Sequence, residues 1–442
     1  MSLRLVIVSS LATLVLSAGC DSPPAPATAQ QNGTETDTTV DTTPKSAQIT
    51  STVSDIPPGE VDMTPPTQAD ADAFEQAKLI MHGMNVGNFL DQPGSQPADP
   101  TTSQCGGITP LEGQATGGVL RGWMFEAIAR AGFDHVRISI NWNCHTHATD
   151  ANLYQIDDVW LKRIDTVVAH VLTRNMAAIV DMHFDWDYIN DLPGARDQFI
   201  SIWTQLSDHF KDYPKQLFFE LLNEPTNISD SKLGADYATV IQIIRATNPY
   251  RTIIYDGNSW AKASELPSLT QYLPSDDHNL IGTDHFYNPY CFTTSDQTWD
   301  CPSNHRSRYQ DVQWPILFPS DYVGDAGDTD AQESEDLVKS HFDSVAAISK
   351  QIGRPIYLGE FGVDRIRNVT SRAAYLSSVT RNAERNGIGW GNWSFTATYD
   401  AWRGTIGWYP EIIKALRPDY IVPADLRIGT ARAVVTAMDS GL

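Results

Sequence analysis

The feature that most constrains the fold is a repeated alternation of apolar, strand-like runs with amphipathic, helix-like segments. It starts near residue 71 and recurs eight times. In the helix-like segments apolar residues return at helical spacing, as Trp160, Ile164, Val167 and Val171 do. The expected strands cover residues 79–87, 135–140, 178–183, 217–224, 252–257, 280–287, 355–362 and 387–395. Eight such units predict an α/β fold, a (β/α)8 TIM barrel with long strand-to-helix loops.

An open, doubly wound sheet has the same alternation and is the alternative fold. Its dinucleotide-binding version needs a Gly-x-Gly-x-x-Gly loop after a strand, and the sequence has none there. This argues for the barrel.

The N-terminal residues predict export. Arg4 precedes an apolar run from Leu5 to Leu16, too short to cross a bilayer, and small residues then lead to Cys20. This pattern resembles the lipobox of bacterial lipoproteins, in which Cys20 would carry the lipid; an ordinary secretory signal is the alternative. We therefore expect an exported protein, lipid-anchored to a bacterial cell membrane on its periplasmic or cell-surface face.

The sequence predicts four regions. Residues 1–19 form a lipoprotein-type signal peptide, and residues 20–70 hold the lipidated cysteine and a disordered linker rich in Thr and Pro. The (β/α)8 barrel domain covers residues 71–418, and residues 419–442 form a C-terminal tail.

Four cysteines remain after Cys20, and an even number in an exported protein favours disulfides. Cys105 and Cys144 follow the first and second strands, whose loops lie side by side in a barrel. Cys291 and Cys301 are close in the long loop after the sixth strand. These positions predict the pairs Cys105–Cys144 and Cys291–Cys301.

The charge of the chain restricts its partners. Lys and Arg number 31 against 54 Asp and Glu, a net charge of −23. Such a chain repels phosphate backbones, so nucleic-acid binding is not expected. A neutral polymer and a monomeric protein are expected instead.

Polar residues stand at the close of nearly every predicted strand. The carboxyl ends of barrel strands meet at one face, and buried polar groups need partners, so these residues predict one site for a polar ligand. They are Asn85, Asn88, Arg137, His183, Asp185, Asn223, Glu224, Asp256, Asn258, His285, Tyr287, Glu360 and Trp393.

Two acids, Glu224 closing the fourth strand and Glu360 closing the seventh, face each other across the barrel mouth. Paired carboxylates across a cleft suit glycoside hydrolysis, with one group as acid and the other as nucleophile or base.

Several motifs, in order on the strands, resemble those of glycoside hydrolase family 5. They are Gly83-Met84-Asn85-Val86-Gly87-Asn88, Gly132-Phe133-Asp134-His135-Val136-Arg137-Ile138, Leu222-Asn223-Glu224-Pro225, His285-Phe286-Tyr287, Gly359-Glu360-Phe361-Gly362 and Gly387-Ile388-Gly389-Trp390 through Trp393. The resemblance covers about residues 75–417. It implies a retaining enzyme that cleaves β-linked polysaccharide without a cofactor or metal, most nearly an endo-β-1,4-glucanase acting on β-glucan.

The resemblance also implies roles for single residues. Glu224 matches the acid/base and Glu360 the nucleophile, while Asn223 matches the residue that holds the sugar 2-hydroxyl. His285 and Tyr287 match the pair that orients the nucleophile side, and Arg137 supports Glu360. His183 matches the third-strand histidine, and Trp393 matches the aromatic floor under the sugar.

One departure from the family pattern is Phe184, which stands where many members have a second histidine. The residues also predict that burial and the neighbouring carboxylate weaken the acidity of Glu224. Tryptophans near the strand ends are either sugar platforms or loop cores: Trp142, Trp186, Trp260, Trp299 and Trp402.

Other activities are open. A β-mannanase, a xyloglucanase or a β-1,3-glucanase shares these motifs, and a non-catalytic carbohydrate-binding barrel is a further class. Cys144-His145-Thr146-His147 could hold zinc, but no partner cluster accompanies it, and a metal-dependent hydrolase needs a His-x-His that the first strand lacks. Acidic side chains of the long loop could bind calcium: Asp325, Asp328, Asp330 and Glu333.

Overall fold

The computed structural model describes residues 60–92, 103, 105, 111–114, 116, 118–147, 154–183, 185–294, 312–316, 331–404 and 407–421. The expected signal peptide, Cys20, Phe184, Trp299, Cys301 and the three aspartates of the calcium hypothesis lie outside these residues. So does all of the predicted tail beyond Ile421.

Eight parallel strands close into a barrel, which confirms the predicted fold. Their order around it is β1-β10-β9-β8-β7-β6-β5-β2. The strands are β1 (His82–Asn85), β2 (His135–Ile138), β5 (Ala177–Asp181), β6 (Leu217–Glu220), β7 (Ile253–Asp256), β8 (Leu280–His285), β9 (Ile356–Phe361) and β10 (Trp390–Asn392). Each lies inside its predicted range or within one residue of it. The structural strands are mostly shorter, because ladder pairing ends where the chain turns toward the barrel mouth.

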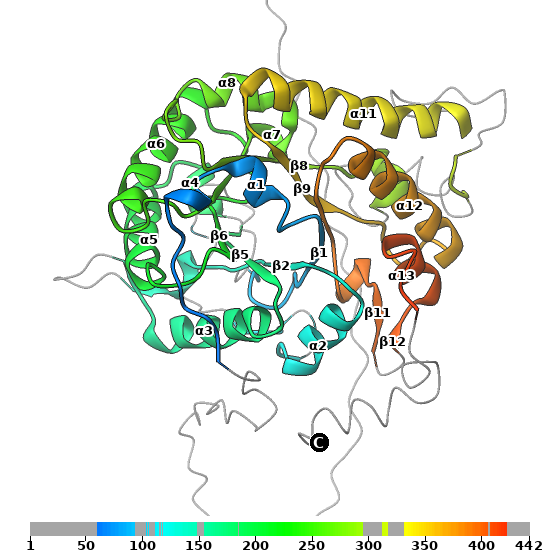
Figure 1. Ribbon diagram of the computed structural model, residues 1–442, viewed down its shortest axis with the longest axis horizontal. Helices are drawn as coiled ribbons and strands as arrows, with labels where there is room; N and C mark the ends of the chain where they lie inside the picture. Colours follow the sequence, from blue (N-terminus) through cyan, green and yellow to red (C-terminus); the bar gives the residue numbers. More distant parts are fainter. Residues whose placement is uncertain are drawn as a thin grey trace, which may run out of the picture. The chain divides into compact units, whose positions relative to one another are not determined.

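Helices surround the barrel (Figure 1). The larger ones are α2 (Gly122–Arg130), α3 (Asp158–Leu172), α5 (Ala195–His209), α6 (Asp230–Thr247), α11 (Ala331–Ile352), α12 (Val369–Arg385) and α13 (Pro410–Leu416). Side-chain caps fix three of their starts: Asp157 accepts from Val159 N–H, Ser229 from Lys232 N–H and Asn368 from Ser371 N–H. In the fifth unit only short helices follow β7, among them α8 (Leu266–Thr270).

The described residues also form shorter elements. The short helices are α1 (Ala73–Ala77), α4 (Trp186–Ile189), α7 (Asn258–Ala261) and α9 (Tyr290–Thr293). Two small hairpins lie in loops: β3 (Thr146–His147) pairs with β4 (Gln155–Ile156), and β11 (Trp402–Arg403) pairs with β12 (Gly407–Trp408). None of the described helices is long and apolar enough to cross a bilayer.

The inside of the barrel changes character along its axis. An apolar cluster that includes Ile179, Phe218 and Ile254 fills its lower part. Because side chains alternate along a strand, the residues two positions later face the same side. These are Asp181, Glu220 and Asp256, all fully buried. The alternation therefore places a layer of buried acids between the apolar plug and the barrel mouth.

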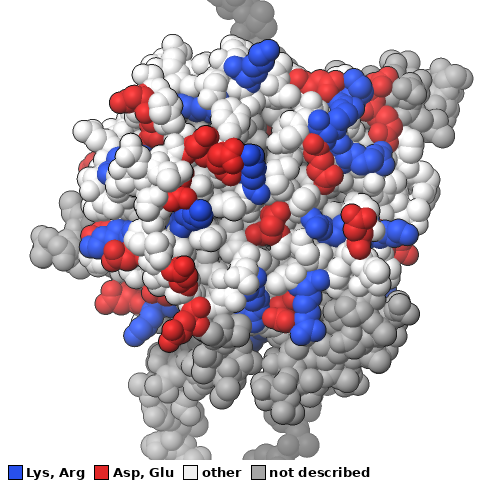
Figure 2. Space-filling view, viewed as in Figure 1, with Lys and Arg blue, Asp and Glu red and all other residues white. Residues whose placement is uncertain are grey.

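The segment Glu60–Asp70 runs along the amino-terminal end of the barrel ahead of α1 (Figure 1). Asp70 forms an ion pair with Lys215 at 2.9 Å, just before β6. The sequence suggested that a disordered linker runs to residue 70, whereas this part packs on the barrel. Acidic and basic side chains are interspersed over the face seen in Figure 2.

Candidate functional site

A cavity of about 320 Å³ opens at the carboxyl ends of the strands. Its lining contains both predicted catalytic acids and several aromatic side chains. The residues are His183, Glu224, Trp260, Lys262, Tyr287, Tyr290, Thr294, Glu360, Trp393 and Tyr399.

Glu224 and Glu360 approach each other closely in this cavity. Glu360 is the fifth residue of β9, and Glu224 lies four residues beyond the end of β6 in a left-handed backbone conformation with φ of 49°. One carboxylate oxygen of each lies within 4.8 Å of the other. Inverting glycosidases separate their carboxyl groups by about 6.5–9.5 Å, to admit a water, and retaining ones by about 5–5.5 Å. The spacing here fits direct attack by a carboxylate.

Arg137 is the hub of the buried charges under the cleft. It donates to Glu360 Oε1 at 2.8 Å, to both oxygens of Glu220 at 2.6 and 2.8 Å, and lies 2.9 Å from Asp181. Burial lowers the pKa of Arg137, but the three carboxylates outweigh burial and raise the pKa above its usual value. Arg137 also donates to Asn223 Oδ1 at 2.7 Å. A permanent cation therefore touches the carboxylate of Glu360, as a nucleophile requires.

His285 and Tyr287 divide their contacts between the two acids. Tyr287 Oη donates to Glu360 Oε2 at 2.9 Å. His285 Nδ1 lies 2.8 Å from Glu224 Oε1 and 3.9 Å from Glu360 Oε2. Tyr287 thus contacts the nucleophile side, as expected, whereas His285 lies near both acids and forms its hydrogen bond with Glu224.

The expected weak acidity of Glu224 is also not found. Burial raises the pKa of the Glu224 carboxyl, but the hydrogen bond and charge of His285, with the charges of His183 and Arg137, lower it further than burial raises it. Burial lowers the pKa of His285, while Glu360 and Glu224 raise it to about 9. At neutral pH the proton of this pair therefore resides mainly on His285, 2.8 Å from Glu224.

His183 and Trp393 form one wall of the cleft. Their rings stack in parallel with centroids 5.5 Å apart. Burial lowers the pKa of His183, but the charge and hydrogen bond of Asp181, 2.9 Å away, raise it to about 9. A Cβ at Gly87 would lie 2.2 Å from the Trp393 ring, so only glycine permits this position of the indole.

The structure separates the described tryptophans into platforms and loop cores. Trp142 is fully buried and donates to the backbone carbonyl of Asp181, and Trp402 is 3% exposed. Trp186 is half-buried and does not line the cleft cavity. Trp260 is 43% exposed and lines the cleft beside Glu224. Of these four, Trp260 is the one placed to contact a sugar.

Sequence reasoning missed Asp181, Glu220, Lys262 and Tyr399. Asp181 and Glu220 hold Arg137 from below, and the other two line the cleft. An ionisable residue inside an otherwise apolar strand was the available signal for the two acids, since it must face a partner.

The predicted disulfide between Cys105 and Cys144 is present. Cys291 is also disulfide-bonded, and its predicted partner Cys301 lies outside the described residues. The zinc hypothesis loses Cys144 to the disulfide. His145 stacks on Trp160 with centroids 3.6 Å apart, and His147 is exposed.

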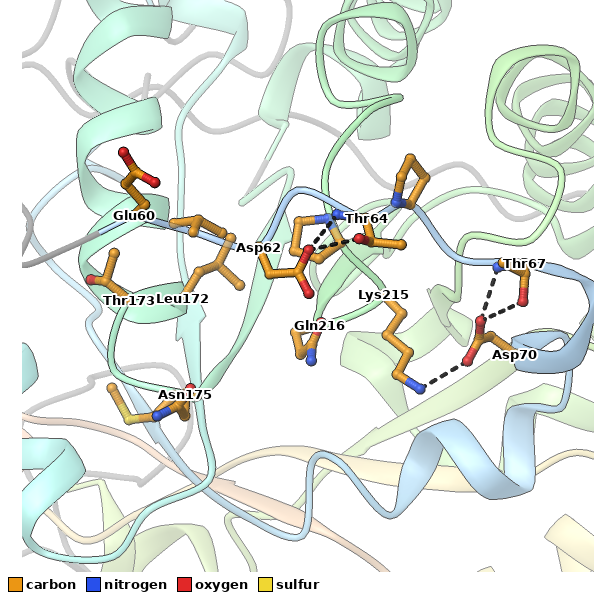
Figure 3. Close-up of a pocket in the computed structure, with 14 residues that line it drawn as sticks. Glu60, Asp62, Thr64, Thr67, Asp70, Leu172, Thr173, Asn175, Lys215 and Gln216 are labelled. Atoms are coloured by element: carbon orange, nitrogen blue, oxygen red, sulfur yellow. Dashed lines mark hydrogen bonds and ion pairs between the residues drawn. The ribbon is translucent and has the colours of Figure 1, made fainter.

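A second cavity, of about 440 Å³, lies at the opposite end of the barrel (Figure 3). It lies between the segment Glu60–Asp70 and the residues before β5 and β6. Its polar groups bind one another: Asp62 accepts from Thr64, and Asp70 accepts from Thr67 and Lys215 (Figure 3). Of these contacts, the one from Lys215 to Asp70 joins the segment to the barrel, and the two cleft acids lie at the other end.

Comparison with known proteins agrees with this geometry. The model of the cellulase family (glycosyl hydrolase family 5) matches residues 121–398. Endoglucanase H of Acetivibrio thermocellus is 30% identical over 75% of this chain and 31% of its own length, and Cellulase/esterase CelE of that organism is 28% identical over 78% and 40%. The chain thus spans less than half the length of these two relatives.

Solved structures are similar over nearly their whole length. Endoglucanase Cel5A of Thermotoga maritima superposes with a TM-score of 0.65 and 30% identity, over 78% of this chain and 99% of its own. Structures of that protein contain cellobiose or mannotriose. With its barrel, its facing acids and a family match over more than half of its residues, this chain belongs to the cellulase family, glycosyl hydrolase family 5.

Proposed function

We propose that this protein is a retaining endo-β-1,4-glucanase, with Glu360 as nucleophile and Glu224 as acid/base. The observation that carries the proposal is the pair of carboxylates within 4.8 Å, one held by Arg137 and Tyr287 and the other by His285. This asymmetry gives the two acids different tasks. Glu360 contacts a guanidinium that is always protonated, whereas Glu224 contacts an imidazole that can exchange a proton.

The reaction has two displacements. A Glu360 oxygen bonds to the anomeric carbon while the bond from that carbon to the leaving sugar breaks, and Glu224 gives its proton to the leaving oxygen. Water then attacks the same carbon, Glu224 takes the proton from that water, and Glu360 leaves as a carboxylate. The His285–Glu224 pair supplies the first proton, because it holds one on their 2.8 Å hydrogen bond. The stacked Trp393 provides an apolar floor for the sugar ring.

Parallel assays identify the substrate. Release of reducing ends is measured on soluble cellulose, mixed-linkage glucan, glucomannan, xyloglucan and β-1,3-glucan. Fastest cleavage of the β-1,4-linked glucans is expected, with a rapid fall in viscosity because an endo-acting enzyme cuts within chains. Binding without release of reducing ends would instead indicate a carbohydrate-binding barrel. Activity lost with EDTA and restored by zinc would indicate a metal-dependent hydrolase.

Mannan is the second candidate substrate. The Thermotoga maritima protein accommodates both cellobiose and mannotriose, and this chain shares its fold and 30% of its aligned residues. Comparable rates on glucomannan and on soluble cellulose would support a dual specificity.

We further propose the cellular setting. Residues 1–19 are a lipoprotein-type signal peptide, Cys20 carries the lipid, and the linker holds the monomeric catalytic barrel, residues 71–418, away from a bacterial membrane. The lipobox-like run before Cys20 supports this proposal. The side of the membrane on which the barrel lies, periplasm or cell surface, is decided by protease accessibility in intact cells.

A further inference from the structure

Three side chains that can bind a metal ion meet in the cleft. Nδ1 of His285 lies 2.8 Å from Oε1 of Glu224 and 3.9 Å from Oε2 of Glu360. A ring nitrogen of the histidine and one oxygen of each acid all lie within 4.8 Å of one another. Imidazole nitrogens and carboxylate oxygens are ligands of zinc, and at open zinc sites three protein ligands leave the fourth position to water. The three residues therefore offer a set of ligands for such an ion.

The spacing of these atoms suits a tetrahedral ion. Zinc binds nitrogen and oxygen at about 2.0–2.2 Å, which places two of its ligands about 3.4 Å apart. The separations from Nδ1, 2.8 and 3.9 Å, lie on either side of this value, and the separation between the acids is at most 4.8 Å. Oε2 of Glu360 also accepts from Tyr287 at 2.9 Å, but a carboxylate oxygen has two lone pairs, so one remains for the ion.

The charges around the site also allow a divalent cation. The carboxylates of Glu224 and Glu360 together balance two positive charges. Arg137 contacts Glu360 at 2.8 Å through the other oxygen, Oε1. The positive charge of this guanidinium is offset in turn by Asp181 at 2.9 Å and Glu220 at 2.6 Å. The guanidinium therefore fixes the Glu360 carboxylate without taking the oxygen that faces the histidine.

Access from solvent distinguishes this site from a second group of possible ligands. The side chain of Glu224 is 23% exposed and lines the cleft cavity. Ligand atoms of Glu220, Asp256 and His285 also lie within 4.8 Å of one another, but these three residues are buried. Both oxygens of Glu220 already accept from Arg137. The group that borders the cleft is therefore the one that an ion can reach.

We propose that Glu224, His285 and Glu360 form a zinc-binding site, and that the bound ion inhibits the enzyme by occupying the space between the two acids. The ion replaces the proton on Nδ1 of the 2.8 Å hydrogen bond, and this proton passes to solvent. A glutamate bound to zinc can neither attack a sugar nor carry a proton, so the ion and a reacting glucan exclude each other. The inhibition rests on the proposed function, whereas the binding of zinc does not.

The ligands also select among cations. Zinc and copper(II) accept imidazole, whereas magnesium and calcium prefer oxygen ligands and bind six or more of them. Burial lowers the pKa of His285, but Glu360 and Glu224 raise it to about 9, so the loss of its proton opposes zinc near neutral pH. Reversible binding of moderate affinity is therefore expected.

Inhibition kinetics give the first test. Zinc chloride at about 1 mM should lower kcat/KM on soluble β-glucan at least about tenfold, as an ion at ten times its dissociation constant would. The apparent KM should rise while kcat is unchanged, because ion and glucan compete for the cleft. Magnesium chloride and calcium chloride at the same concentration should change the rate less than about twofold. Added EDTA should restore the rate.

Calorimetric titration with zinc chloride gives the second test, because it measures binding without turnover. His285→Asn removes the nitrogen ligand and should weaken the strongest zinc site at least about tenfold. His341→Asn is the matched control. His341 also contacts a carboxylate, Asp284 at 2.6 Å, but the described residues place no second carboxylate beside this pair in a group of three ligands. This variant should retain both the zinc affinity and the inhibition.

A measurement on the wild-type protein covers the case in which His285→Asn does not fold. Anomalous scattering at the zinc edge, from a crystal soaked in zinc chloride, should place the ion about 2.0–2.2 Å from the three ligand atoms. No ion there, an unchanged zinc affinity in a folded His285→Asn, or inhibition without a rise in KM would overturn the inference. A protein that binds zinc through His285 but cleaves no glucan would refute the proposed function and leave the zinc site intact.

Discussion

Arg137 contacts three carboxylates, and Glu360 is the one among them that borders the cleft. The guanidinium stays protonated at any working pH, so it stabilises the ionised form of Glu360. Glu224 instead forms a hydrogen bond with His285, an imidazole that, unlike a guanidinium, can give up its proton; burial lowers its pKa, but Glu360 and Glu224 raise that pKa to about 9. At the scale of single residues, the choice of cationic neighbour distinguishes the proposed nucleophile from the proposed acid/base.

Alanine substitutions should separate these roles. Glu360→Ala should abolish glycosyl transfer, since no covalent intermediate can form. Added azide should restore cleavage of the substrate and give the α-glycosyl azide as product. Glu224→Ala should lose about 10²–10⁴-fold on β-glucan but retain the first step on aryl glycosides with acidic leaving groups, and azide should then give the β-azide. Product anomers are read by NMR. A wild-type product that appears first as the α-anomer would mean inversion and would contradict both assignments.

Trp260 is the exposed aromatic of the cleft, and its substitution should affect polymer binding. Ser259, Trp260 and Ala261 all have φ near 60°, and the Trp260 N–H donates to the carbonyl of Pro225 at 3.2 Å, which fixes the indole beside the catalytic turn. Trp260→Ala should lower kcat/KM on β-glucan by about 2–10-fold, mainly through KM, in line with about 0.5–1.5 kcal/mol for an aromatic stacking contact. Tyr272→Ala, equally exposed but outside the cleft, is the control.

At the scale of elements, the alternation of strands and helices was predictable because each half-buried helix and each buried strand leaves its own periodicity. The eight strands follow from local residues alone. The pKa of Glu224 does not, because His285 lies 61 positions away and its hydrogen bond depends on how β6 and β8 are placed in the barrel. Likewise Glu220 is visible in the sequence as an ionisable residue in an apolar strand, but its partner Arg137 lies 83 positions away and is identified only in the folded barrel.

Asp134 joins the first two strands and gives the barrel a pH-dependent stability. It accepts the His82 N–H at 2.9 Å and contacts His135 Nδ1 at 2.7 Å. Burial raises the pKa of Asp134, but His135 and His82 outweigh it and lower the pKa to about 2. A lowered pKa stabilises the fold above the ordinary value of 3.8, and this stability is lost as pH falls toward 2.

Asp134→Asn should therefore reduce the free energy of unfolding at neutral pH by about 1–2 kcal/mol, a figure reduced for solvent screening of a side chain that is 33% exposed. Urea unfolding of both proteins between neutral pH and pH 2 measures the difference. It should shrink as the pH falls below 4, and a constant difference would exclude the charge as its cause.

At the scale of the whole molecule, the proposed lipid at Cys20 makes a simple prediction. Cys20→Ala should move the enzyme from the membrane fraction to the soluble fraction, because the acyl chains account for the binding. Its activity on soluble glucan should not change, since the barrel is untouched. Unaltered fractionation would contradict the anchor.

The segment Glu60–Asp70 enters the fold at the amino-terminal ends of β5 and β6, and the cleft opens at the carboxyl ends of the same strands. A tether attached to the chain before residue 60 therefore acts on the end of the barrel opposite the mouth of the cleft. Such a tether would leave the mouth of the cleft, at the opposite pole, free of the attachment point.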